Sequence, residues 1–204
     1  MNALFFVLLG YLSGSVLYAY YLPLWLRRID VTADTEDGNP GVFNCVARAG
    51  WPMGLLALAC EIAKGALPVL LARAVLDPGR WIFALVIAAP VAGHAWSLFR
   101  PGRGGKGIAV SFGVMLGLLP LWQPFALLAA CYLLFSLVVQ IQPHRFRSLA
   151  SYFCFGAGML LHFGLTPVGT GCALSAAIVM DRHRLGSPEE ERPSVRVRRL
   201  RNTG

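Results

Sequence analysis

The chain has 204 residues, of which 56% are hydrophobic and only 14% are charged, and its mean hydropathy is +0.60. Soluble domains carry about 25% charged residues, and disordered chains are poorer still in apolar residues, so both classes are excluded. The 22 glycines show no triplet period and the five cysteines are too few for a disulfide scaffold, which leaves an integral membrane protein of one domain.

Hydrophobic segments of about the length that crosses a bilayer, roughly 17–25 residues, follow one another along the chain. The predicted spans are residues 3–26, 51–76, 81–99, 108–119 and 122–142, followed by two halves of 148–180. The first is expected to be retained, because it is too long for the apolar core of a signal peptide and no basic segment precedes it. The predicted fold class is therefore an all-α membrane protein, a seven-transmembrane-helix bundle formed by residues 1–180.

Helix-breaking residues divide two long stretches. Residues 107–142 would be about 54 Å long as one helix, too long for one span, so Pro120 and Pro124 are expected to separate two helices. The sequence GLTPVGTG, which starts at Gly164, divides residues 148–180 into halves that both look short. Short helices need burial within the bundle or a wet cavity beside them, so an internal polar site is expected.

The basic residues predict the orientation in the membrane. The net charge is +8, and most of the 18 Lys and Arg residues lie in alternate turns, on the same side as the C-terminus. The positive-inside rule therefore places the N-terminus outside and the C-terminus in the cytoplasm, with residues 181–204 as a cytoplasmic basic tail. Because topology accounts for most of the charge, no nucleic-acid partner is expected.

Two predicted cytoplasmic loops are rich in glycines and hydrogen-bond donors. In GNPGVFN, residues 38–44, the glycines permit a turn with converging N–H groups, and Asn39 and Asn44 add amide donors, which suits an anion. In RPGRGGKG, residues 100–107, three cations and four glycines precede a helix N-terminus that favours a phosphate, with Lys106 as a point charge. An ordinary Gly-Asn turn and an ordinary basic loop are the alternatives.

Other patterns exclude several chemistries. Gly102, Gly104 and Gly107 have the spacing of a dinucleotide-binding fingerprint, but no soluble strand precedes them and no acidic ribose partner follows. Neither a nucleophile elbow nor zinc-ligand spacing nor a carboxylate cage is recognisable, so no metal or other cofactor is expected.

Ionisable residues inside the predicted spans mark a functional site. Glu61 and Lys64 are three residues apart on one helix face, where they could form an ion pair. Such a pair could serve a functional site or only the structure. His94 is the better candidate for a site, because it lies near the cytoplasmic end of its span and close in sequence to the glycine-rich loop.

Taken in order, these segments resemble the bacterial integral-membrane acyl-phosphate:glycerol-3-phosphate acyltransferases, the PlsY family. The match covers residues 8–184. The motifs that carry it are GNPG at 38–41 with Asn44, GH at 93–94, RGGKG at 103–107, SLAS at 148–151 and RHR at 182–184.

The resemblance implies an enzyme of the bacterial inner membrane whose site faces the cytoplasm. Members of the family transfer a fatty acyl group from acyl phosphate to the 1-hydroxyl of glycerol 3-phosphate, giving lysophosphatidic acid for phospholipid synthesis. They use no metal or coenzyme, and a substrate phosphate is thought to act as the base. The lipid bilayer delivers the acyl chain.

The resemblance also implies roles for individual residues. Lys106, Ser151 and His183 would act in catalysis, with Lys106 holding a phosphate and His183 positioning substrate. The residues implied for substrate and phosphate binding are Asn39, Gly41, Asn44, Arg48, His94, Arg103, Gly104, Gly105, Gly107 and Ser148.

The sequence departs from the family pattern beside these motifs. Glu36 and Asp37 stand where Gly-Ser is usual, and two acids near an anion site are expected to repel the anion. The position of a family Arg falls on Ala47, with Arg48 one place away. Three functions fit the sequence: an active acyltransferase, a paralogue that binds phosphate or lipid without catalysis, and a transporter that shares the bundle.

Overall fold

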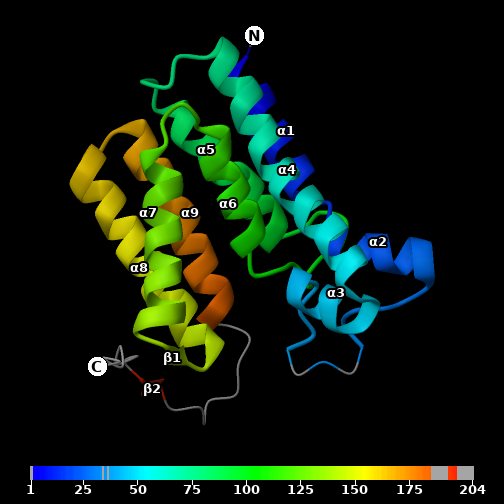
Figure 1. The fold of residues 1–204 in the computed structure, drawn as a ribbon. Helices are drawn as coiled ribbons and strands as arrows, with labels where there is room; N and C mark the ends of the chain where they lie inside the picture. The colour runs from blue at the N-terminus through cyan, green and yellow to red at the C-terminus, as the bar shows by residue number, and fades with distance from the viewer. Residues whose placement is uncertain (1, 34, 36, 185–192, 197–204) are drawn as a thin grey trace.

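The computed structural model describes residues 2–33, 35, 37–184 and 193–196. In this part of the chain nearly all regular structure is helical, and most helices lie side by side in a bundle (Figure 1). The helices are α1 (Ala3–Ser15), α2 (Tyr18–Arg27), α3 (Val42–Ala49), α4 (Trp51–Val75), α5 (Ile82–Ala95), α6 (Ile108–Gly117), α7 (Gln123–Leu133) with a π-helical turn (Leu134–Val138), α8 (His144–Phe163) and α9 (Pro167–Arg184). The predicted helical class is confirmed.

The described chain also contains one short pair of strands. β1 (Ile141–Gln142) pairs antiparallel with β2 (Ser194–Val195), beyond the end of α9. Most of the predicted basic tail, 181–204, lies outside the described residues.

The helix lengths differ from those of seven straight spans. Among the described helices, only α4 is long and apolar enough to cross a membrane alone. Helices α1 and α2 pass the same test together, as a segment bent by 48°. Helices α5 and α6 are apolar but have only 14 and 10 residues. The number of seven spans and their orientation therefore remain predictions.

One expectation about local structure was wrong, and one helix was not predicted. Helices α8 and α9 have 20 and 18 residues, so the halves of 148–180 are not short. The interruption is narrow because Gly164, with φ of +64°, ends α8 and Pro167 already begins α9, a position that suits proline. Helix α3, which Gly41 caps, was not predicted, whereas residues 38–41 are non-helical and compatible with the expected turn.

The bend between α1 and α2 is held by two side chains of α4. A break in a helix leaves backbone groups without helical partners, which is costly in an apolar layer. Lys64 Nζ donates a hydrogen bond to the Val16 carbonyl at 2.6 Å, and the Ala19 N–H donates to Glu61 Oε1 at 3.2 Å. These contacts supply partners for two of the backbone groups that the bend removes from regular helical hydrogen bonding.

Helices α1 and α5 approach each other closely through small residues. A Cβ atom on Gly14 would lie 2.0 Å from the Pro90 carbonyl oxygen, and one on Gly93 would lie 2.0 Å from the Tyr11 carbonyl oxygen. Glycine at such positions lets two backbones touch, a common means of association between membrane helices. This packing fixes the C-terminal end of α5, which carries His94.

The bundle separates a packed interior from an apolar exterior. The largest buried side chains come from α5, α6 and α8, among them Phe83, Met115, Tyr152 and Phe155. Large apolar side chains are also exposed on the outside, and Leu161 is 88% exposed. A wide apolar surface of this kind is what a lipid-facing bundle requires.

We expect Gly93→Ala to destabilise the bundle, because the added methyl group meets backbone that cannot rotate away. Overpacking costs about 1–3 kcal/mol, and the contact with the Tyr11 carbonyl places this variant at the upper end. The thermal midpoint in detergent measures the effect. Gly156→Ala is the matched control, since its Cβ would lie 3.2 Å from the Ala176 methyl carbon, a milder contact. Equal midpoints for the two variants would contradict the close packing of α1 and α5.

Candidate active site

The glycine-rich loop folds back against the end of α5. The Gly105 N–H donates to the His94 carbonyl at 3.0 Å, and a Cβ on Gly104 would lie 2.0 Å from the Ala95 carbonyl oxygen. Gly107 has a left-handed φ of +85° and caps α6 at its N-terminus. The loop thus holds Lys106 beside the start of α6, where helix N–H groups favour an anion.

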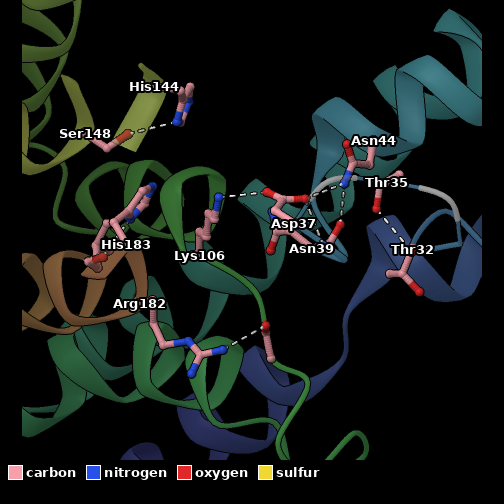
Figure 2. A network of polar contacts seen from close by, with 12 residues as sticks. Thr32, Thr35, Asp37, Asn39, Asn44, Lys106, His144, Ser148, Arg182 and His183 are labelled. Atoms are coloured by element: carbon pink, nitrogen blue, oxygen red, sulfur yellow. Dashed lines mark hydrogen bonds and ion pairs between the residues drawn. The ribbon is translucent and has the colours of Figure 1, made fainter. Parts of the chain in front are cut away.

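The first glycine-rich loop meets Lys106 through Asp37. Lys106 Nζ lies 2.7 Å from Asp37 Oδ2, and Asp37 Oδ1 accepts from the Asn39 N–H at 3.1 Å and from Asn44 Nδ2 at 3.2 Å (Figure 2). Asn44 Nδ2 also donates to the Asn39 carbonyl at 2.9 Å. Asp37 is predicted to repel an anion. In the structure its carboxylate accepts hydrogen bonds from the same donors, Lys106, Asn39 and Asn44, that are predicted to bind the anion.

Asp37 is ionised at neutral pH. Partial burial acts to raise its pKa, but the hydrogen bond from Lys106 and those from Asn39 and Asn44 outweigh burial, so the pKa lies below its ordinary value. The stability from this pair is therefore present above the ordinary pKa of Asp37 and is lost as the pH falls through the lowered pKa.

A cationic cavity of about 520 Å³ lies on one side of the Lys106–Asp37 pair. Its charged wall residues are Asp37, Arg100, Arg103, Lys106 and Arg182. Arg182 Nη2 donates to the Gly104 carbonyl at 3.2 Å, which ties α9 to the glycine loop (Figure 2). With four cations and one acid, this cavity suits a ligand of more than one negative charge.

A larger cavity of about 1330 Å³ also adjoins the pair. Asp37, Asn39 and Lys106 line both cavities. Apolar side chains of α4, α6 and α7 form much of the second wall, including Leu58, Ile62, Phe112, Leu116 and Phe125. The second wall also carries the ionisable residues Glu61, His94, His144, Arg145 and Arg147. A largely apolar cavity thus adjoins a cationic one, and Lys106 lines both.

Beneath the loop lies a buried cluster of ionisable side chains. Lys64 Nζ is 2.7 Å from Glu61 Oε2 and 2.9 Å from His94 Nδ1, and all three residues are at most 5% exposed. The other ring nitrogen of His94 faces the backbone of Gly105, whose Cβ would lie 2.1 Å from it. The predicted pairing of Glu61 with Lys64 is present, and His94 supports the loop from below while also lining the larger cavity.

The serines of α8 lie outside the walls of the two described cavities. Ser151 Oγ donates to the Arg147 carbonyl at 2.8 Å, within its own helix. Ser148 Oγ lies 3.4 Å from His144 Nδ1. Both serines are buried. The structure places Ser148 beside His144, and no described contact joins Ser151 to Lys106.

His183 lies behind His144. The two rings stack with centroids 5.9 Å apart and planes 18° apart, and His183 Nδ1 lies 2.8 Å from the Val179 carbonyl oxygen. His183 is 1% exposed, whereas His144 lines the larger cavity. His183 can therefore influence a ligand in that cavity indirectly, by holding the His144 ring in place.

The remaining candidates divide between the cavity walls and the surface. Gly41 lines the larger cavity and Arg103 the smaller one. Arg48 is exposed on α3 and lines neither cavity, so its role in substrate binding stays a prediction.

Sequence reasoning did not select several residues of the cavity walls. Among them are Thr32, Asp37, Arg100, His144, Arg145, Arg147 and Arg182. Arg182 was signalled by the RHR motif, Asp37 by its departure from the family pattern and Arg100 by its place in RPGRGGKG. Arg145 and Arg147 were counted only among the basic residues that predict the topology. Within the described residues, no group of three or more His, Cys, Asp or Glu side chains is arranged to hold a metal ion.

Comparison with known proteins identifies the family. The profile of the glycerol-3-phosphate acyltransferases matches residues 4–186. The chain belongs to this family. The glycerol-3-phosphate acyltransferase of Myxococcus xanthus is 34% identical over 172 residues, 84% of this chain and 81% of the relative. That of Pseudomonas aeruginosa is 40% identical over 144 residues, 71% of each chain.

Solved structures of this family share the fold. Crystal structures of PlsY, an integral membrane glycerol 3-phosphate acyltransferase, superpose with TM-scores of 0.74 for the lysophosphatidic acid form and 0.76 for the glycerol 3-phosphate form. Their identities to this chain are 25% and 24%, and each match covers 89% of this chain and 88% of the other. The family expected from the loop motifs is confirmed.

We expect Glu61→Gln to destabilise the protein by about 3–5 kcal/mol, because Lys64 would keep a buried charge without its anionic partner. The glutamine retains an acceptor for the Ala19 N–H, so the change isolates the charge. Glu61→Gln combined with Lys64→Met removes both charges and is expected to cost less than Glu61→Gln alone. Thermal midpoints in detergent measure the stability of both variants. A double variant less stable than Glu61→Gln would contradict a charge pair between Glu61 and Lys64.

Proposed function

We propose that the chain transfers a fatty acyl group from acyl phosphate to the 1-hydroxyl of glycerol 3-phosphate, producing lysophosphatidic acid. The observation that carries this proposal is the position of Lys106 between a cationic cavity and an apolar-walled one, in a member of the glycerol-3-phosphate acyltransferase family. Glycerol 3-phosphate needs a cationic cavity for its phosphate, and acyl phosphate needs an apolar cavity for its chain. Both phosphates need the cation that the two cavities share.

Each cavity suits one substrate. The cationic cavity, with Arg100, Arg103 and Arg182, offers guanidinium groups for the phosphate of glycerol 3-phosphate. The larger cavity offers apolar walls for the acyl chain of the donor. Acyl phosphate would lie with its phosphate at Lys106 and its chain toward Phe112 and Phe125.

The proposed reaction requires positioning more than activation by a side chain. The 1-hydroxyl oxygen attacks the acyl carbon, the bond from that carbon to the phosphate oxygen breaks, and phosphate leaves with the electron pair. The hydroxyl proton passes to a phosphate oxygen. Lys106 and the N–H groups of the glycine loop would stabilise the charge that develops on the carbonyl and leaving oxygens.

We also propose the seven-span topology for this chain. The spans would be α1 with α2, α4, α5, α6, α7 with its π-helical turn, α8 and α9. The glycine-rich loops and most of the basic residues would then face the cytoplasm, in the inner membrane of a bacterium. The bilayer would deliver the acyl chain from the side of the larger cavity.

One observation favours a second candidate, a family member that binds phosphate without turnover. Asp37 bonds Lys106, Asn39 and Asn44, which are the donors expected to hold a phosphate. When the hydrogen-bond donors of a site are already occupied by the site's own carboxylate, the site binds a phosphate weakly. Acyl phosphate would then not be positioned for transfer of its acyl group. A transporter is not retained, because the chain belongs to a family of acyltransferases.

We expect the purified protein to release inorganic phosphate and lysophosphatidic acid from acyl phosphate and glycerol 3-phosphate. Lys106→Ala should lower kcat by about 10²–10³-fold, the usual loss when one preorganised donor to a transition-state oxygen is removed. Arg80→Ala, in the exposed turn after α4, is the control and should retain activity. No turnover by the wild-type chain, with saturable binding of acyl phosphate, would support the binding paralogue instead.

We expect Arg182→Ala to raise the KM for glycerol 3-phosphate more than it lowers kcat, because Arg182 lines the cationic cavity and ties the glycine loop to α9. The same kinetic comparison on Arg48→Ala tests whether Arg48 replaces the family Arg that falls on Ala47. A KM raised as much by Arg48→Ala as by Arg182→Ala would establish that replacement, against the placement of Arg48 on the outer face of α3.

A further inference from the structure

We propose that Asp37 is a competing carboxylate, which sets how tightly the site binds a phosphate by occupying the same donors. The inference rests on the proposed function only for the identity of the natural ligand, a phosphorylated substrate. The competition itself concerns any phosphate at Lys106.

The contacts of Asp37 reproduce those of a bound oxyanion. One oxygen faces the Lys106 ammonium at 2.7 Å, and the other accepts from a backbone N–H and a side-chain amide at 3.1 and 3.2 Å. Ammonium groups, converging backbone N–H groups and amides are the donors that bind phosphate oxygens in proteins. A phosphate at Lys106 and the Asp37 carboxylate therefore need the same donors.

The Lys106–Asp37 pair lies where a substrate phosphate would have to compete with Asp37 for Lys106. Asp37, Asn39 and Lys106 line both cavities, so their contact lies in the wall between the cationic and the apolar chamber. In the proposed reaction the acyl carbon and the acceptor hydroxyl must meet at this boundary. A phosphate that takes Lys106 from Asp37 would move the carboxylate out of that boundary.

The pair is weak enough to be displaced. The side chains of Lys106 and Asp37 are 19% and 30% exposed, so water screens their attraction. A phosphate monoester carries a charge of about −1.5 to −2 and several strong acceptor oxygens, against a single charge on the carboxylate. Asp37 thus lowers the affinity for phosphate without blocking the site.

The experiment measures binding of inorganic phosphate to the full-length protein in detergent by titration calorimetry. Asp37→Asn removes the charge and keeps an oxygen acceptor for the Asn39 N–H and the Asn44 amide. We expect Asp37→Asn to lower the phosphate Kd about two- to fivefold, the range that corresponds to partly exposed ion pairs. Asp37→Glu keeps the charge and should remain closer to wild type than Asp37→Asn does.

Two controls separate competition from other effects. Asp77→Asn removes one exposed carboxylate at the other end of α4, where Asp77 Oδ1 accepts from the Gly79 N–H at 2.8 Å, and should leave the phosphate Kd unchanged. In a Lys106→Ala background, Asp37→Asn should have little further effect, because the contested cation is gone. Thermal midpoints verify folding, and Asp37→Ser is the second variant if Asp37→Asn is unstable.

Several outcomes would overturn the inference. One is a phosphate affinity that is unchanged or weaker in both Asp37→Asn and Asp37→Ser. Another is an equal gain of phosphate affinity in Asp77→Asn. A third is a gain of phosphate affinity from Asp37→Asn that persists in the Lys106→Ala background. The absence of phosphate binding in every variant would overturn it as well. A gain in binding without turnover by any variant would uphold the competition and reject the acyltransferase proposal, so the two failures are distinguishable.

Discussion

The bundle depends on a set of buried polar contacts around Lys64. One ammonium group contacts the Glu61 carboxylate, the His94 ring and the Val16 carbonyl, all within 3 Å of Nζ. In an apolar layer each of these groups needs a partner, so their positions are fixed relative to one another. The bend between α1 and α2, the middle of α4 and the end of α5 are thereby tied together, and the glycine loop lies on His94.

This constraint determines where the glycine-rich loop can lie. The loop is bound to α5 through the Gly105 N–H and to α9 through Arg182, and only glycine fits against Ala95 at position 104. Lys106 is consequently held beside the N-terminus of α6, between the two cavities. The cation that the proposed chemistry needs is presented by backbone packing, and the neighbouring carboxylate of Asp37 tunes how available it is.

Much of this could be predicted from local patterns. Apolar runs located the helices, prolines at 120 and 124 marked the break between α6 and α7, and the glycines with Lys106 marked the loop. Helix α3 was missed because its eight residues lack a long apolar repeat, and α8 and α9 were underestimated because GLTPVGTG contains several breakers although only Gly164 adopts a left-handed φ. The partner of Lys106 was missed because its 69-residue separation from Asp37 leaves no local signal.

The sequence by itself determined that the chain is an apolar helical protein and which family its motifs resemble, since hydrophobicity, glycine spacing and charge placement are local properties. The tertiary structure decided which charges meet. It paired Asp37 with Lys106, placed His144 in front of His183, and left Arg48 outside the cavities. Those outcomes depend on how helices distant in sequence pack, because electrostatic contacts are set by distances of a few ångströms that no linear pattern encodes.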